Sequence, residues 1–221
     1  STFIKFTDSY DRIHVSFQSE NLGLRKNILH SINDCFLRFD SLIILEDDCI
    51  PSSDFFNFMN WGLIHFKDTS DIFSLSSVNF LPRNIFSDSV FISRYHHCWG
   101  WATWKDRWEQ TSFSGKELLN QIRTKKLANE FNLEGSNNYV DLLQKQILGE
   151  INSWAILWHA SMFLQNRLSL YPPYSLVSNE GGDGLGTHFG NNQLYSQKIS
   201  DEIDFSLPSS IEQSEEYRDA L

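Results

Sequence analysis

The chain has 221 residues, a formal net charge of −10, and 41% hydrophobic and 21% charged residues. This length supports one sizeable core rather than two. The acidic balance argues against a nucleic-acid partner, because no surplus of Lys and Arg can neutralise phosphates, and suits a divalent cation better.

No apolar run is long enough to cross a bilayer, and the N-terminal residues lack the order of a signal peptide. Cys35, Cys49 and Cys98 form an odd set without the spacing of a metal knuckle. They are typical of reduced thiols in a cytosolic protein. We therefore expect a cytoplasmic protein without a transmembrane segment, and peripheral association with the inner face of the membrane is compatible with this composition.

In chain order, the alternation of Ile13, Val15 and Phe17 predicts a short strand. Apolar residues at helical spacing predict a helix in "LRKNILHSINDCFLRF", residues 24–39. The continuous apolar run at 42–45 is typical of a parallel strand covered on both faces, and it ends in the acids of "LIILEDD". Pro51 and the polar residues after it end this strand and start the next helix.

Further elements follow the same alternation. Pattern and spacing predict helices over 54–66, 115–131, 138–149 and 153–165, and a strand over 72–79. The fold class is therefore α/β, with a mainly parallel doubly wound sheet flanked by helices and a more helical C-terminal half. We expect one domain over residues 1–190 and an acidic tail over 191–221. Ligands of such sheets bind beyond the carboxyl ends of the strands.

Three adjacent carboxylates follow the apolar run: Glu46, Asp47 and Asp48. Carboxylates at the mouth of a buried strand repel one another and are costly to desolvate, so a cation among them is the simplest partner. Mg²⁺ or Mn²⁺ takes oxygen ligands and is commonly held by one or two carboxylates together with substrate phosphates. Alternatively, the three acids cap the following helix or pair with Arg or Lys.

Resemblance favours the cation. "LIILEDDCIPSSDFFNF" resembles the metal-binding segment of GT-A glycosyltransferases, in particular the protein N-acetylglucosaminyltransferase I family and bacterial sugar transferases of polysaccharide gene clusters. Four further segments resemble the same family in the same order, and together the similar segments span residues 20–188. They read "ENLGLRKNI", "CWGWATWKDRW", "INSWAILW" and "YPPYSLVSNEGGDGLGTH".

The resemblance implies a sugar transfer from a nucleoside diphosphate donor, most simply a UDP-linked one, to a carbohydrate acceptor. It implies that Asp48 and His188 hold Mn²⁺ or Mg²⁺, and that the donor-binding residues are Asn21, Gly23, Glu46 and Asp47. Members of this family begin with a strand and helix that hold the nucleotide base. Only about twenty residues precede "ENLG" here, so we expect that first unit to be missing and a sheet edge to be exposed.

Four of the seven tryptophans lie between residues 99 and 108. In a helix, Trp101, Trp104 and Trp108 would share one face and belong to a core. Trp99 precedes a glycine, where its ring could stack on the apolar face of a sugar. The acceptor-binding candidates are Trp99, Trp101 and Trp154. The neighbouring "HHC" suggests zinc only weakly, because adjacent histidines on a strand point to opposite faces, and Cys98 is more simply structural than nucleophilic.

An inverting transfer needs a carboxylate that takes the proton of the acceptor hydroxyl. The position that matches the family's base is Asn152, and asparagine cannot act as a general base. Glu150 and Asp183 are the catalytic candidates in its place, although the alternative roles are an interaction of Glu150 with the positive end of the following helix dipole and stabilisation of a turn by Asp183. Two alternatives stay open: an inactive carbohydrate-binding remnant, and a metal-dependent phosphohydrolase that uses the same acids to activate water.

Overall fold

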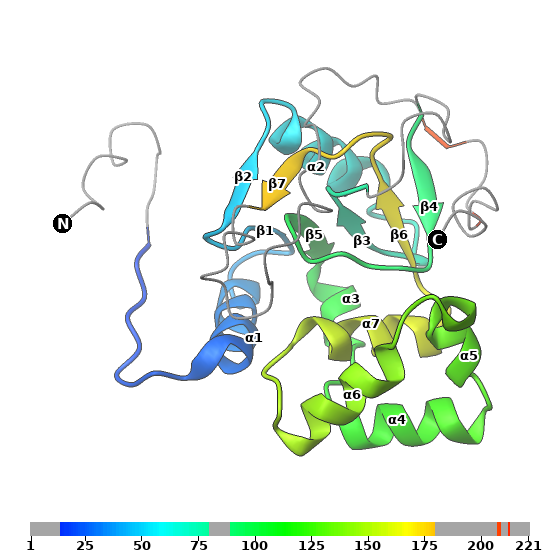
Figure 1. Cartoon of the computed structure of the whole chain (residues 1–221). Coiled ribbons are helices and arrows are strands. Elements are labelled where there is room, and N and C mark those ends of the chain that lie inside the picture. The colour runs from blue at the N-terminus through cyan, green and yellow to red at the C-terminus, as the bar shows by residue number, and fades with distance from the viewer. Residues whose placement is uncertain (1–13, 80–88, 180–206, 209–211, 213–221) are drawn as a thin grey trace.

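The computed structural model describes residues 14–79, 89–179, 207–208 and 212 as a mixed α/β fold (Figure 1). The helices are α1 (Gly23–Phe36), α2 (Phe55–His65), α3 (Lys105–Glu109), α4 (Gly115–Thr124), α5 (Ala128–Phe131), α6 (Tyr139–Leu148) and α7 (Ala155–Leu164), with a 3-10 turn at Leu133–Gly135. The strands are β1 (Ser41–Ile44), β2 (Cys49–Pro51), β3 (Ile72–Ser76), β4 (Phe91–Ser93), β5 (Trp101–Trp104), β6 (Leu168–Tyr171) and β7 (Val177–Asn179). No helix in these ranges is long and apolar enough to span a bilayer.

The main sheet is mixed rather than mainly parallel. Its strand order is β1-β5-β3-β6-β4, and β2 pairs with β7 in a separate two-stranded sheet. Among the described strands of this sheet, β3 and β6 form the one parallel pair, whereas β1 with β5, β5 with β3 and β6 with β4 are antiparallel. The prediction of a mainly parallel sheet was wrong because it did not foresee β4 and β5, which are short and rich in aromatic residues.

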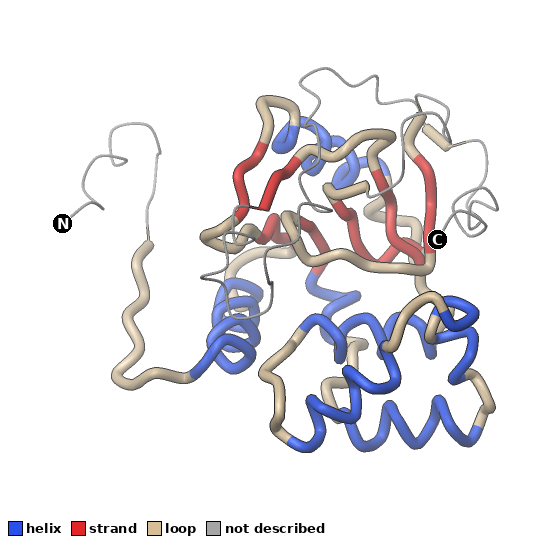
Figure 2. The backbone as a smooth tube through the Cα atoms, viewed as in Figure 1, coloured by secondary structure: helices blue, strands red, loops and turns tan. Residues whose placement is uncertain are grey.

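The three strands β1, β3 and β6 nevertheless run in one direction, because β5 is antiparallel to both β1 and β3. Helix α2 covers one face of the sheet, and α1, α3 and α7 cover the other (Figure 1). Helices α4, α5 and α6 pack around α7 in a helical half that Figure 2 shows apart from the strands. The predicted α/β class is thus confirmed in this coarser, mixed form.

Several predicted boundaries differ from the observed ones. The predicted helix over 115–131 divides into α4 and α5, because Lys126 adopts a positive φ of 59° between them. The described part of the predicted N-terminal strand forms no pairing, and Val15 and Phe17 are 53% and 89% exposed. The strand predicted over 72–79 ends at Ser76, and the proposed boundary at residue 190 lies outside the described residues.

Candidate functional site

The carboxyl ends of β1, β3 and β6 meet at one edge of the sheet. Antiparallel pairing places Ile44 opposite Trp101, so the acids that follow β1 lie beside the residues that precede β5. The segments after β3 and before β7 meet there as well, because Leu176 N donates to the carbonyl of Ser77 at 2.8 Å. This edge therefore gathers chain segments from four parts of the sequence.

Gly100 is the tightest point of this edge. Its φ is +64°, and a Cβ built there would lie 2.8 Å from Ser77 Oγ and 2.8 Å from Val177 Cγ2. The carbonyls on either side are also fixed, since Ser77 N donates to Gly100 O at 3.1 Å and Ser77 Oγ donates to Trp99 O at 2.6 Å. Only glycine combines this backbone conformation with such close packing.

The three acids differ in their surroundings. Asp47 is exposed, whereas Glu46 and Asp48 are half-buried. Burial, and then the charge of Asp48, raise the pKa of Glu46, while a hydrogen bond from the Trp154 side chain acts in the opposite direction. The cluster thus offers one half-buried carboxylate held by an indole, one exposed carboxylate at Asp47 and a second half-buried one at Asp48.

Two thiols border the acids and are held in the protonated form. The Cys49 thiol donates to Asp48 Oδ1 at 3.6 Å, and burial together with the Asp48 charge raises the pKa of Cys49 to about 12. Burial, followed by the charge of Glu46, raises the pKa of Cys98 well above its usual range. Since the thiolate is the reactive form of cysteine, these surroundings favour a structural role for both.

The structure joins two of the sequence motifs that lie more than a hundred residues apart. Asn21 Oδ1 accepts a hydrogen bond from Gly23 N at 2.8 Å at the start of α1. Gly23 has a φ of +69°, and a Cβ there would lie 2.7 Å from Asn152 Nδ2. Two residues after Asn152, Trp154 reaches Glu46. The predicted donor-side residues Asn21, Gly23 and Glu46 are therefore connected through the segment that precedes α7.

Two of the three predicted acceptor-binding tryptophans are inside the core. Trp101 and Trp154 are 0% and 1% exposed, so neither presents a ring face to a sugar, and this prediction was wrong for them. Trp101 and Trp104 also lie on opposite faces of a strand rather than on one face of a helix, because residues 101–104 form β5. Trp99 is half-buried and stays a candidate.

Of the two predicted catalytic acids, one is exposed two residues before Asn152, and the other lies outside the described residues. Glu150 is exposed at the end of α6, where its backbone N donates to Lys145 O at 2.9 Å after Gly149 takes a left-handed conformation with φ of 77°. Asn152 is the residue of this segment that lies nearest to a Cβ built at Gly23. Asp183 and His188 lie outside the described residues.

The donor atoms at this edge fit a hard divalent cation. Asp47 and Asp48 supply carboxylate oxygens, and Mg²⁺ or Mn²⁺ is commonly held by one or two such groups together with ligand phosphates. Within the ranges that the structure describes, no group of three or more His, Cys, Asp and Glu side chains is placed to hold an ion. Among the described residues the "HHC" segment forms no such group either, and Nδ1 of buried His96 lies 3.0 Å from Ser74 Oγ.

Two connections at this edge were missed by sequence reasoning: the Trp154 bond to Glu46 and the packing of Asn152 on Gly23. Both join residues far apart in the chain, so no local pattern indicates them. Comparison with known proteins adds no family: no protein-family model matches the chain, and no curated protein matches it.

Proposed function

We propose that the chain is an inverting, metal-dependent glycosyltransferase. It transfers a sugar from a nucleoside diphosphate donor, UDP-linked by resemblance, to a carbohydrate acceptor. The observation that supports this function is the location of Asp47 and Asp48 at the carboxyl end of β1, beside a half-buried carboxylate and the Gly23–Asn152 contact. Ligands of open α/β sheets bind at this kind of edge.

Each donor-side residue has a proposed task. Asp48, with His188, would hold Mg²⁺ or Mn²⁺, and such an ion supplies positive charge for a departing diphosphate. Glu46 is oriented by Trp154 and would accept hydrogen bonds from hydroxyls of the sugar or ribose. Asp47 is exposed beside it and would do the same or bind a metal-bound water.

In the reaction, the acceptor oxygen forms a bond to the anomeric carbon while the bond from that carbon to the diphosphate oxygen breaks. The electron pair of the broken bond leaves with the diphosphate, and the hydroxyl proton passes to a carboxylate. Glu150 and Asp183 are the proposed bases. Trp99 is the proposed stacking surface for the acceptor sugar.

Calorimetric titration of UDP with and without Mn²⁺ tests the donor site. We expect binding that requires Mn²⁺ and that is lost in Asp48→Asn, because the variant removes the negative charge with little change in shape. Asp68→Asn, at an exposed position after α2, is the matched control and should bind like the parent chain. Absence of both UDP binding and donor turnover in the parent chain would count against the proposal.

A second function is favoured by one specific observation. Asn152 occupies the position that matches the family's base, and its side chain packs on Gly23. A chain without a base at this position could bind saccharides without transferring sugar. This alternative predicts saccharide binding with no release of UDP from any UDP-sugar, even in the presence of Mn²⁺ and acceptor.

A further inference from the structure

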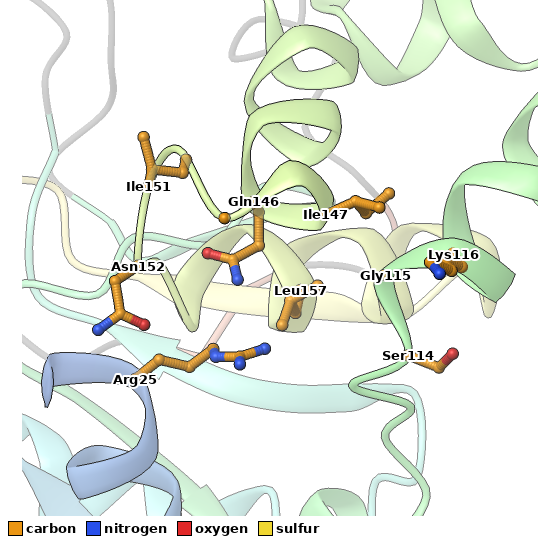
Figure 3. A pocket seen from close by; sticks show the side chains of 10 residues that line it. Arg25, Ser114, Gly115, Lys116, Gln146, Ile147, Ile151, Asn152 and Leu157 are labelled. Carbon is orange, nitrogen blue, oxygen red and sulfur yellow. The ribbon is translucent and has the colours of Figure 1, made fainter. Parts of the chain in front are cut away.

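A cavity of about 580 Å³ lies between the start of α1, the start of α4, the end of α6 and the segment before α7 (Figure 3). Its walls carry two cations, Arg25 and Lys116, two amides, Gln146 and Asn152, and apolar side chains that include Ile147 and Leu157. None of the described residues that line it is acidic. Its volume is in the range typical of small-molecule sites.

Arg25 is the central cation of this cavity. Figure 3 shows its guanidinium reaching from α1 into the space beneath Gln146 and beside Leu157. Its Nε is buried and has no hydrogen-bond partner among the described residues. No carboxylate of the described residues forms an ion pair with it. A half-buried guanidinium with a donor of this kind is best satisfied by an anion, because an unpaired buried charge is costly.

The neighbouring amide adds a second donor. Gln146 is 7% exposed, and its Oε1 accepts a hydrogen bond from Ser153 N at 2.5 Å. This bond fixes the orientation of the amide, so its NH₂ group is left on the side of the cavity (Figure 3). A side-chain NH₂ offers donors only, which suits an oxyanion rather than a cation.

The start of α4 completes a positive surface. Leu118 N donates to Ser114 O at 3.0 Å, so the N–H groups of the first turn before it have no intrahelical partner, and Ser114 makes no side-chain cap. Gly115 brings this turn close to α6, since a Cβ there would lie 2.9 Å from Ile147 Cγ1. Lys116 is exposed at the rim. Glu117 of the same turn is exposed and does not line the cavity, so the helix dipole adds to the charge of Arg25 and Lys116 there.

We propose that this cavity binds a phosphoryl group, with Arg25 as the principal ligand and Lys116 and Gln146 as supporting donors. An arginine fork pairs with phosphate oxygens through two parallel hydrogen bonds. The source of the group is either free phosphate or a phosphorylated saccharide whose body occupies the apolar part of the cavity. The proposal does not depend on the transferase activity.

Calorimetry on the full chain in EDTA, without metal, tests this site with three probes: inorganic phosphate, glucose 6-phosphate and glucose. We expect phosphate-containing probes to bind, and Arg25→Gln to weaken that binding at least about tenfold, in line with the loss of a charge-assisted hydrogen bond. Lys26→Gln is the matched control, because Lys26 is exposed on the same helix and does not line the cavity. It should bind within about twofold of the parent chain, because surface charges away from the ligand contribute little.

The comparison of probes identifies the source. Tighter binding of glucose 6-phosphate than of phosphate assigns the cavity to a phosphorylated saccharide, and equal binding assigns it to free phosphate. No phosphate binding by the parent chain, or equal loss in Arg25→Gln and Lys26→Gln, would overturn the proposal. Arg25→Lys keeps the charge without the fork and serves if Arg25→Gln does not fold. Loss of UDP binding in Asp48→Asn with phosphate binding intact separates this site from the donor site.

Discussion

The indole rings of Trp101 and Trp154 are stacked, with centroids 5.1 Å apart and planes inclined by 24°. They join β5 to the start of α7 and are continuous with Trp158, whose centroid lies 5.5 Å from that of Trp101. Because both rings are enclosed, their contribution is to the stability of the edge that carries the acids, rather than to direct contact with a ligand.

Trp154→Ala should therefore lower the free energy of unfolding by about 3–5 kcal/mol, the usual cost of emptying an aromatic site in a core. Urea denaturation followed by circular dichroism measures this loss. Trp99→Ala is the comparison, because Trp99 is half-buried. We expect a smaller stability loss there and, if the transferase proposal holds, a weaker apparent affinity for the saccharide acceptor. A Trp154→Ala protein as stable as the parent would contradict the core assignment.

The Gly23–Asn152 contact predicts a coupling between two variants. Gly23→Ala should be destabilising for two reasons: the φ of +69°, which costs a side chain about 1–2 kcal/mol, and the approach to Asn152 Nδ2 at 2.7 Å. Removing the amide with Asn152→Ala should relieve the steric cost of the close approach and leave the backbone cost of the positive φ. Urea midpoints for the two single variants and the double variant give the coupling.

Gly149→Ala is the matched control for the backbone term, because Gly149 has a φ of +77° and nothing lies within 4 Å of a Cβ built there. Its cost should equal that of Gly23→Ala in the Asn152→Ala background. The stability losses of the two single variants can be added to predict the loss in the double variant. If the double variant is no more stable than this sum predicts, the contact is absent.

The acids after β1 and the Gly23–Asn152 contact differ in how far the sequence alone predicts them. The acids after β1 and the helices around them follow from local apolar runs and breakers, so their order and approximate bounds were predictable. The Gly23–Asn152 contact and the Trp154 bond to Glu46 depend on where α1 and α7 pack on the sheet. Nothing in a local window specifies that packing.

The spacing of the tryptophans between residues 99 and 108 was misleading for a related reason. Its tryptophans occur at a spacing that fits a helix, yet residues 101–104 pair with β1 and β3. Tertiary pairing overrode the helical period, because aromatic side chains fit a pleated surface with both faces buried. The same strand, together with β4, made the sheet mixed.

His159 predicts a loss of stability in acid. The ring stacks on Phe131 with centroids 5.3 Å apart, and within the described part of the chain neither ring nitrogen has a hydrogen-bond partner. Burial, and then the nearby charges of His97 and Arg94, lower the pKa of His159 to about 3. In the unfolded chain this histidine therefore takes up a proton near pH 6.5, whereas in the folded chain it stays neutral until about pH 3. The free energy of unfolding falls as the pH drops from about 6.5 toward 3.

Urea midpoints at pH 7 and pH 5 measure this effect. His159→Phe should flatten the acid limb, which is the fall in the free energy of unfolding between pH 7 and pH 5. The reduction should reach up to about 1.4 kcal/mol per pH unit, because phenylalanine cannot take up the proton. His30→Gln, at an exposed position on α1, should leave the limb unchanged. An acid limb that is identical in His159→Phe and in the parent chain would contradict the assignment.

Cys35 and Cys49 should react with alkylating reagents at very different rates. Cys35 is exposed on α1, whereas Cys49 is buried and has a pKa of about 12. At pH 8 we expect iodoacetamide to modify Cys35 first and Cys49 only after unfolding, because the thiolate is the reactive form. Peptide mass spectrometry over time in native buffer and in urea measures both rates. Rapid native labelling of Cys49 would be inconsistent with its surroundings.

The choice of base can be settled by comparing two isosteric variants. Glu150→Gln and Asp183→Asn each remove one proton acceptor, and the variant that removes the base should lower the rate of sugar transfer by about 10²–10⁴-fold, while UDP and Mn²⁺ still bind. Glu109→Gln, at the exposed end of α3, is the control for the loss of a surface charge. The rate of sugar transfer measures the chemical step, and calorimetric titration of UDP measures binding separately. If both variants transfer sugar like the parent chain, neither acid is the base.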